Sequence, residues 1–314
     1  MSATLAPGVE QRDTFACFGS QCTVIVTDAQ AHNAAAAVIV ARRRLLEWHG
    51  QFSRFEPGSE LTRLNDAVSE TVHVSPLMRR VVEAAIGAAE ATGGLVDPTL
   101  LDQIEQAGYD AHFDRPGLPL VEALALAPAR RRGRPSAQEG WRSVRTDRRT
   151  STVTRPPGLR IDPGGIAKGV FADELGAALA GHQAFVVECA GDLRLGGRLA
   201  PAREIHVASP FEDAILHTFT LCSGGVATSG IGKRSWLRPD GSVAHHLLDP
   251  ATGMPAYTGI VQVTALAPTA IEAEALSKAA LLAGPGQAER LLVHGGVIVL
   301  DDANFIVLET GARG

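Results

Sequence analysis

Apolar and polar residues alternate through residues 14–27, a short period that is typical of a half-buried strand. Residues 31–48 instead place apolar side chains at helical spacing. Strand-like segments return repeatedly after residue 140. They are predicted near residues 142–146, 150–155, 184–188, 204–208, 215–220, 225–228, 243–248, 259–266, 297–300 and 304–308. Strands outnumber helices without alternating strictly with them, so the pattern predicts an α+β fold with mixed or antiparallel sheets and packed helices.

Capping and breaking residues locate the other helices. Ser59 is a good N-cap for a short helix, and Ser75 followed by Pro76 predicts a longer helix that ends at Gly93-Gly94. Further helices are predicted over residues 166–180, 270–283 and 286–294.

The segments between these elements predict the domain organisation. We expect residues 1–13 to form a disordered tail and residues 14–314 to form a single domain. Residues 110–140 hold four prolines and the basic run Arg130-Arg131-Arg132. This composition predicts an exposed insertion whose basic run is a solvated face.

Composition narrows the class of partner. The chain has 314 residues with a formal net charge of −5, so no basic excess points to nucleic acid. No apolar run is long enough for a membrane span, and the first residues do not resemble a leader. We therefore expect a cytoplasmic protein with no nucleic-acid or membrane partner. Four cysteines lack zinc-ligand spacing and are expected to be small buried thiols: Cys17, Cys22, Cys189 and Cys222.

The strongest chemical signal is the glycine turn at residues 162–169, with the sequence DPGGIAKG. Glycines ahead of a helix let backbone N–H groups approach a ligand, and a helix N-terminus favours an anion. Lys168 adds a cation in the first helical turn. The turn therefore predicts a phosphate site that is not a P-loop, because GxxxxGK[ST] is absent. The alternative from this turn alone is a purely structural tight turn.

Other polar turns are weaker candidates. They lie at residues 93–99, 190–192, 228–230 and 245–253. A lone histidine is more often structural or on the surface, but His246 lies in a run with Asp249, Thr252 and Gly253, which makes a functional role a stronger candidate. Glu274 and Lys278 share a helix face and could form either a site or a surface ion pair. No GxSxG motif supports nucleophilic hydrolysis.

Seven of these segments, taken in order, resemble the ApbE family of FAD:protein FMN transferases over residues 14–300. The matching segments are FGS at 18–20, SRF…SEL…RLN at 53–65, VDPT at 96–99, DPGGIAKG at 162–169, AGD at 190–192, HLLDPATG at 246–253 and APTAIEAEALSKA at 267–279. The resemblance implies an ApbE-like, T-fold-like domain. It also implies transfer of the FMN phosphoryl group of FAD to a Thr or Ser hydroxyl of a target flavoprotein, with release of AMP.

The turns and the resemblance together predict the residues of the site. FAD is expected to contact Phe18, Phe55, Asp97, Asp162, Gly164, Gly165, Ala167, Lys168, Asp192, Thr228, Ser229, Gly230 and Lys278. His246 and Asp249 are both candidates for the base or for holding the reacting group, and the sequence does not rank them.

The metal site that the resemblance implies departs from the family. Mg²⁺ would be held by the Ala167 carbonyl, Glu274 and the residue at position 278. Lys278 cannot ligate while it is protonated, because its ammonium has no lone pair. We therefore expect either that Mg²⁺ binds elsewhere or that Lys278 supplies part of its charge. This departure keeps two alternatives open, a FAD-binding carrier or sensor without transfer activity and a FAD pyrophosphatase.

Overall fold

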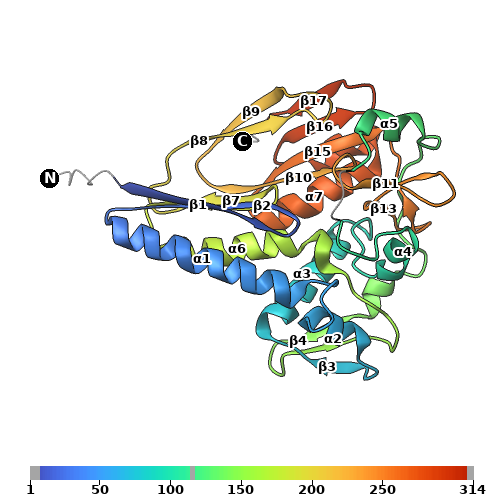
Figure 1. Ribbon diagram of the computed structural model, residues 1–314, viewed down its shortest axis with the longest axis horizontal. Coiled ribbons are helices and arrows are strands. Elements are labelled where there is room, and N and C mark those ends of the chain that lie inside the picture. The colour runs from blue at the N-terminus through green and yellow to red at the C-terminus, as the bar shows by residue number, and fades with distance from the viewer. Residues whose placement is uncertain (1–7, 114–116, 310–314) are drawn as a thin grey trace.

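An antiparallel sheet of eight strands forms the centre of the molecule (Figure 1). The computed structural model describes residues 8–113 and 117–309. The strand order is β1-β2-β6-β7-β10-β15-β16-β17. In that order the strands span Val9–Cys17, Ser20–Asp28, Ala184–Cys189, Asp192–Gly196, Gly224–Gly230, Ile260–Ala267, Gly296–Leu300 and Phe305–Leu308. The α+β class with antiparallel pairing is therefore confirmed.

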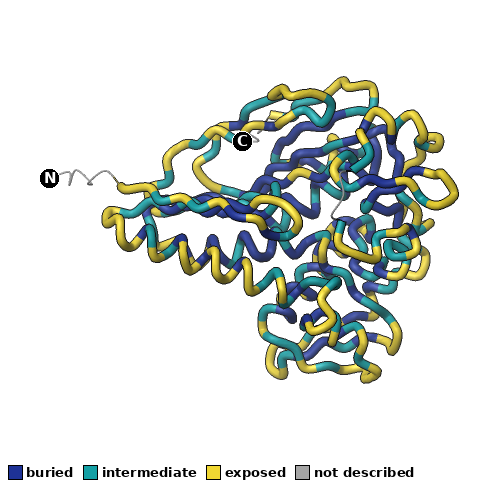
Figure 2. The backbone as a smooth tube through the Cα atoms, in the orientation of Figure 1, coloured by how far each residue is buried: buried dark blue, intermediate teal, exposed yellow. Residues whose placement is uncertain are grey.

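One face of this sheet is covered by α1 (Ala31–Phe52), α6 (Ala167–Leu179) and α7 (Ala270–Ala283). The other helices of the described residues are α2 (Glu60–Asp66), α3 (Pro76–Ala91), α4 (Leu101–Gln106), α5 (Leu120–Ala125) and α8 (Pro285–Leu291). Helix α1 packs on β1 and β2, α6 on β6 and β7, and α7 on β10 and β15, while α6 contacts both α1 and α7. The buried residues concentrate between this layer and the sheet (Figure 2).

Four small sheets surround the centre. Their strands are β3 (Thr71–His73), β5 (Thr152–Thr154) and β4 (Arg145–Asp147); β8 (Arg203–Ala208) and β9 (Ile215–Leu221); β11 (Ser235–Leu237) and β12 (Val243–His245); and β13 (Leu248–Asp249) and β14 (Met254–Pro255). The β8–β9 hairpin lies on the side of the large sheet that is opposite α1 and α6 (Figure 1).

Local capping explains the helix starts that the sequence predicts. The Ser59 hydroxyl accepts the N–H of Thr62 at 3.0 Å, and the Ser75 hydroxyl accepts the N–H of Met78 at 3.1 Å. Each bond satisfies one of the N–H groups that a helix start leaves without a partner.

Two tight turns bring the site together at one end of the sheet. Phe18 and Gly19 join β1 to β2 with φ of 54° and 69°, and Ala190 and Gly191 join β6 to β7 with φ of 55° and 99°. Positive φ at both central residues suits a hairpin turn, but a side chain at the first position costs about 1–2 kcal/mol. Because β2 pairs with β6, the two turns lie at the same end of the sheet.

The structure differs from the expected domain limits in two places. Strand β1 begins at Val9, so residues 9–13 belong to the sheet and not to a tail; residues 1–7 lie outside the described residues. The expected insertion is also more than an exposed excursion. Within it α5 buries Leu120 and Ala123, and the Gly133 N–H donates to the Leu282 carbonyl at 2.8 Å. The basic run is exposed as expected.

The cysteine prediction is confirmed for three of the four residues. Cys17, Cys22 and Cys189 are buried free thiols, whereas Cys222 is free but exposed just after β9. Across residues 8–113 and 117–309, no helix is both long enough and apolar enough to cross a bilayer.

Candidate active site

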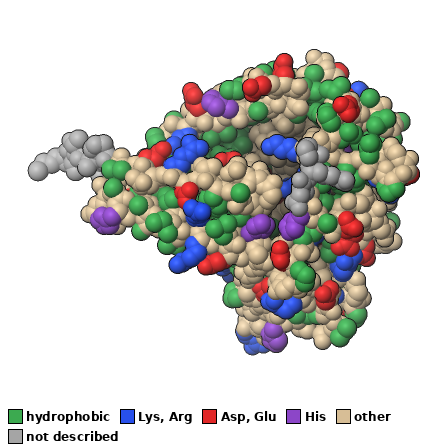
Figure 3. Space-filling view, viewed as in Figure 1, with side chains coloured by type: hydrophobic (Ala, Val, Ile, Leu, Met, Phe, Trp, Pro, Cys, Tyr) green, Lys and Arg blue, Asp and Glu red, His purple; other side chains and the backbone are tan. Residues whose placement is uncertain are grey.

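A cavity of about 1120 Å³ opens where the predicted turns converge. Its wall includes the Phe18 and Ala190 turns, the glycine turn before α6, the end of β10 and part of β8. The space-filling view shows the hollow, with Lys, Arg and His side chains around it (Figure 3). This volume is slightly above the range of about 300–1,000 Å³ that is usual for small-molecule sites.

The glycine turn forms one wall of the cavity. Residues Pro163–Gly165 make a single 3-10 turn that leads into α6. Asp162 caps this turn, because its Oδ1 accepts the Gly164 N–H at 2.9 Å, and its Oδ2 lies 3.5 Å from Nε of Arg54. Residues 162–168 line the cavity, so the start of α6 borders it, and a helix start is a position that favours an anion.

Lys168 is held beside the cavity by two acidic side chains. Its ammonium pairs with Asp192, which is 1% exposed, and lies 3.6 Å from Oε1 of Glu274. Burial alone would lower the pKa of Lys168, but the charges of Asp192 and Glu274 outweigh it and raise that pKa. Lys168 therefore stays a cation, and Asp192 supports it from behind the wall.

Glu274 is wholly buried at the contact between α6 and α7. Its Oε1 accepts from the Lys278 ammonium at 3.0 Å, and its Oε2 accepts the Gly169 N–H at 2.8 Å. A Cβ at Gly169 would lie 2.8 Å from the Ala270 carbonyl oxygen, so only glycine lets the two helices approach this closely. Burial, and then Asp192, raise the pKa of Glu274 to about 7, while Lys278 and Lys168 oppose the shift. Glu274 and Lys278 are thus not the surface ion pair that the spacing alone allows.

The residues expected to hold Mg²⁺ do not fit a divalent cation. Glu274 is the one carboxylate of the expected set, and both its oxygens already accept hydrogen bonds, one of them from an ammonium. Within the described residues, no cluster of three His, Cys, Asp or Glu side chains could hold a metal ion. The buried charges instead form two cations and two anions that balance each other: Lys168, Lys278, Asp192 and Glu274.

His246 lines the cavity. Its Nδ1 is buried and has no hydrogen-bond partner among the described residues. Burial and the nearby Arg234, followed by His245 and Lys278, hold the pKa of His246 well below its usual value. His246 is therefore a neutral imidazole in the cavity wall, the form that can accept a proton.

Asp249 lies away from the cavity wall. Its Oδ1 accepts the N–H groups of Arg134 at 2.8 Å and Ala251 at 3.2 Å, and its Oδ2 accepts the Thr252 hydroxyl at 3.1 Å. All of these bonds hold the loop that follows β13. The structure therefore separates the two candidates that the sequence leaves unranked, because His246 lines the cavity and Asp249 braces the chain beside it.

Aromatic side chains line two parts of the cavity. The Phe55 ring lies 4.2 Å from the Arg54 guanidinium and 4.6 Å from the His112 ring. The Phe18 ring stacks on Phe171 with centroids 5.5 Å apart. Both phenylalanines line the cavity, as does His112, which the sequence analysis did not single out.

The remaining predicted residues also reach the wall. Asp97 accepts both the N–H and the hydroxyl of Thr99 on Oδ1, while its buried Oδ2 has no partner and burial raises its pKa. The Thr228 hydroxyl lies 2.8 Å from that of Thr264, and the Ser229 hydroxyl 2.8 Å from that of Ser277. Gly164, Gly165, Ala167, Gly230 and Lys278 line the cavity as well.

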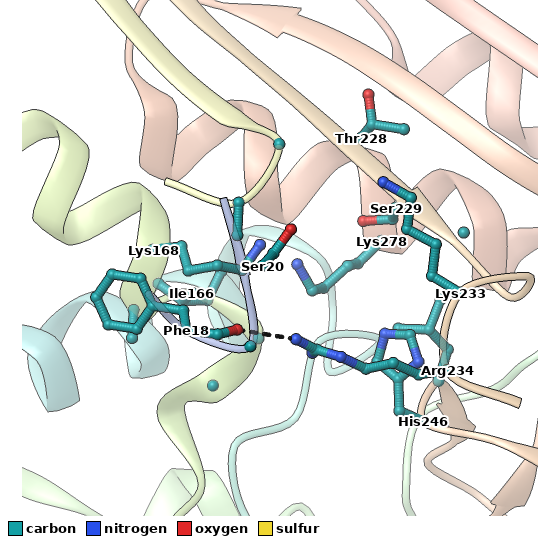
Figure 4. A pocket seen from close by; sticks show the side chains of 18 of the residues that line it. Phe18, Ser20, Ile166, Lys168, Thr228, Ser229, Lys233, Arg234, His246 and Lys278 are labelled. Atoms are coloured by element: carbon teal, nitrogen blue, oxygen red, sulfur yellow. Dashed lines mark hydrogen bonds between the residues drawn. The ribbon is translucent and has the colours of Figure 1, made fainter. Parts of the chain in front are cut away.

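Three cations of the described wall were not among the predicted site residues: Arg54, Lys233 and Arg234. Lys233 and Arg234 come three and four residues after the end of β10, and they lie across the cavity from Lys168 (Figure 4). The signal that could have found this pair is its position, since two consecutive basic residues stand shortly after the polar end of β10.

Comparison with known proteins gives one consistent result. The sequence pattern of the ApbE family matches residues 18–300. The chain is 30% identical to the FAD:protein FMN transferase of Treponema pallidum over 243 residues, 72% of this chain and 65% of that protein. It is 25% identical to the FAD:protein FMN transferase of Escherichia coli K12 over 254 residues, 79% of this chain and 71% of that protein. The match thus spans slightly less than two thirds of the Treponema protein.

Solved structures agree on the fold. The ApbE protein of Thermotoga maritima superposes with a TM-score of 0.75 at 28% identity, covering 96% of this chain and 97% of that one. The flavinyl transferase ApbE of Pseudomonas stutzeri gives a TM-score of 0.74 at 22% identity, covering 98% and 96% of the two chains, and supports the fold alone. With a family pattern that covers most of its length and the same fold in these structures, the chain belongs to the ApbE family.

Proposed function

We propose that this protein is a FAD:protein FMN transferase. It would move the FMN phosphoryl group of FAD to a Thr or Ser hydroxyl of a target flavoprotein and release AMP. Support comes from the relatives named for this activity and from a cavity that combines a helix N-terminus, several cations and aromatic walls. The observation that carries the proposal is that His246, whose buried Nδ1 has no partner among the described residues, lines the same cavity as the glycine turn.

The chemistry follows from what each part can do. Amides at the start of α6 and the ammonium of Lys168 would bind the diphosphate of FAD. Phe18 and Phe55 offer flat apolar surfaces for the rings of the dinucleotide. His246 would take the proton of the acceptor hydroxyl as its oxygen attacks the phosphorus on the FMN side. The bond from that phosphorus to the bridging oxygen breaks, and the electron pair leaves with AMP.

Substrate binding would also prepare the base. In the free protein the cations Arg234 and Lys278 help to hold the pKa of His246 down. A bound diphosphate carries negative charge into the same space and offsets those cations, so it would raise the pKa of His246. The histidine would then become a stronger base only when FAD is present.

Lys278 would take over part of the charge that a divalent cation supplies. Its ammonium is fixed by Glu274 at 3.0 Å and lies against the glycine turn, since a Cβ on Gly165 would be 3.6 Å from Cε of Lys278. Positive charge in this position would stabilise the diphosphate without a metal ion. A cytoplasmic location, and a cytoplasmic acceptor with it, stay predictions.

One experiment separates this proposal from its alternatives. The protein is mixed with FAD, with and without an extract of source cells from which its own gene is deleted. AMP release that needs the extract, together with a fluorescent flavin band on a denaturing gel, would support the transferase. Free FMN without the extract would indicate a pyrophosphatase. Unchanged FAD that stays bound in both mixtures would indicate a carrier or sensor.

A further inference from the structure

Arg234 stands in the cavity without a balancing acid. Among the described residues no carboxylate lies within 4.0 Å of its guanidinium, and its Nη2 donates a hydrogen bond to the Phe18 carbonyl at 3.2 Å (Figure 4). Its charge lowers the pKa of both Lys168 and His246, so it faces these groups across the cavity. A half-buried cation that faces other basic groups is unfavourable until an anion enters.

Three other cations of the described wall already have acidic partners. Lys168 pairs with Asp192 and Lys278 pairs with Glu274. Arg54 lies within ion-pair distance of Asp162 and Glu105. Lys233 has no ion pair among the described residues, but its side chain is exposed to water. Arg234 is therefore the half-buried cation of the described wall that has no acidic partner.

The Phe18 carbonyl orients the Arg234 guanidinium by accepting a hydrogen bond from it. Phe18 adopts φ of 54°, in the left-handed region that a residue with a side chain occupies at a cost of about 1–2 kcal/mol. In this conformation its carbonyl oxygen receives the Arg234 N–H, as the dashed line in Figure 4 shows. Strain of this kind persists where the surroundings determine it and often marks a functional position.

The loop that carries Arg234 is fixed on both sides. The Ile231 N–H donates to the Val261 carbonyl at 3.0 Å. The Ser235 hydroxyl donates to the Leu118 carbonyl at 2.8 Å, and the Trp236 indole donates to the Ala107 carbonyl at 3.0 Å. Little conformational freedom would be lost when the guanidinium binds a ligand, so its position is set before binding.

We propose that Arg234, oriented by the Phe18 carbonyl, is a further cavity residue that binds the phosphoryl groups of the dinucleotide and so helps to distinguish FAD from flavins without phosphate. This inference rests on the proposed function and adds a residue to it. The fork of a guanidinium suits two phosphate oxygens at once, which a lysine ammonium does not match.

The test compares two flavins that share one ring system. FAD and riboflavin are titrated against the wild-type protein, Arg234→Gln and Arg234→Lys, with flavin fluorescence as the signal. Arg234→Gln is expected to weaken FAD binding roughly 10- to 100-fold, the range for a lost charge-assisted hydrogen bond. Riboflavin affinity is expected to change less than about twofold, since it offers no phosphate. Arg234→Lys should fall between the two.

Arg238→Gln is the matched control. It removes the same charge from a side chain only four residues away, and Arg238 donates to the Gln106 carbonyl outside the cavity wall. It should leave both affinities unchanged, and circular dichroism should show all variants folded. Equal losses of affinity for FAD and for riboflavin in Arg234→Gln would overturn the proposal in favour of a structural role. Unchanged FAD affinity in that variant would overturn this proposal and leave the proposed function standing. A wild-type protein that binds no FAD would overturn it together with the proposed function.

Discussion

Replacing Lys278 tests whether an ammonium does the work of a metal ion in this site. The perturbation is Lys278→Thr, which removes the ammonium from Glu274 and leaves a hydroxyl that can ligate a cation. Lys278→Met is its control, because it fills similar space without any ligand atom. Both variants and the wild-type protein are assayed for AMP release with excess EDTA and with excess Mg²⁺.

The structure sets the size of the effect. Lys278 Nζ lies 3.0 Å from Oε1 of Glu274, so a divalent ion on that oxygen would be roughly 4 Å from the ammonium. At an effective dielectric of about 20, the repulsion between them is about 8 kcal/mol. That is about the whole binding free energy of a micromolar ligand. Mg²⁺ is therefore expected not to bind Glu274 while Lys278 is present.

The expected pattern differs for the three proteins. Wild-type activity should survive EDTA and gain little from Mg²⁺. Lys278→Met should lose roughly 10- to 100-fold in either condition, the range for a lost contact to a charged group. Lys278→Thr should be as weak in EDTA but recover with Mg²⁺. Wild-type activity that disappears in EDTA and returns with Mg²⁺ would refute the reasoning.

The remaining predictions concern the base, the turn and pH. His246→Ala should reduce transfer by about 100- to 10,000-fold with FAD affinity unchanged. Equal losses of transfer and FAD binding in this variant would assign His246 to binding. Asp249→Asn removes hydrogen bonds that hold a loop, so it should lower the melting temperature and change the rate only several-fold. In Gly165→Val the new Cβ would already be in contact with Cε of Lys278 at 3.6 Å, so the two methyl groups beyond it are expected to crowd the turn and weaken FAD binding. Gly165→Ala, which adds only the Cβ, is the milder control in the same titration, and unchanged affinity in Gly165→Val would make the turn purely structural. Burial lowers the pKa of His245 to about 4 in the folded protein, whereas the same histidine in the unfolded chain is protonated as the pH falls below about 6.5. Protonation therefore favours the unfolded chain, and about 3 kcal/mol of the free energy of unfolding should be lost between about pH 6.5 and 4. Urea unfolding of the wild-type protein and His245→Gln would show this, and an equal pH dependence in both would contradict it.

Local signals predicted much of the fold correctly. The starts of the helices after Ser59 and Ser75 could be predicted, because a serine whose hydroxyl accepts an early helical N–H is recognisable in the sequence. The glycine turn at residues 162–165 leads into α6 and lines the cavity, as the position of its glycines before a helical pattern indicates. Helices α4 and α5 were missed, because six residues are too few to show a period.

Tertiary contacts decided what the sequence could not. Asp249 and His246 are three residues apart and equally plausible on paper, and only the hydrogen bonds of Asp249 to Arg134 and Thr252 show that it faces away from the cavity. Arg234 donates a hydrogen bond to the carbonyl of Phe18, a residue more than two hundred positions earlier in the chain. Neither contact leaves a local pattern that propensity or spacing could reveal.

The most direct test of the central claim is a structure of the protein with bound FAD. The account predicts that the diphosphate lies between the start of α6 and Arg234, with the FMN-side phosphorus within reach of a hydroxyl that His246 Nδ1 can approach. A diphosphate bound away from Lys168 and Arg234, or FAD bound outside this cavity, would contradict it.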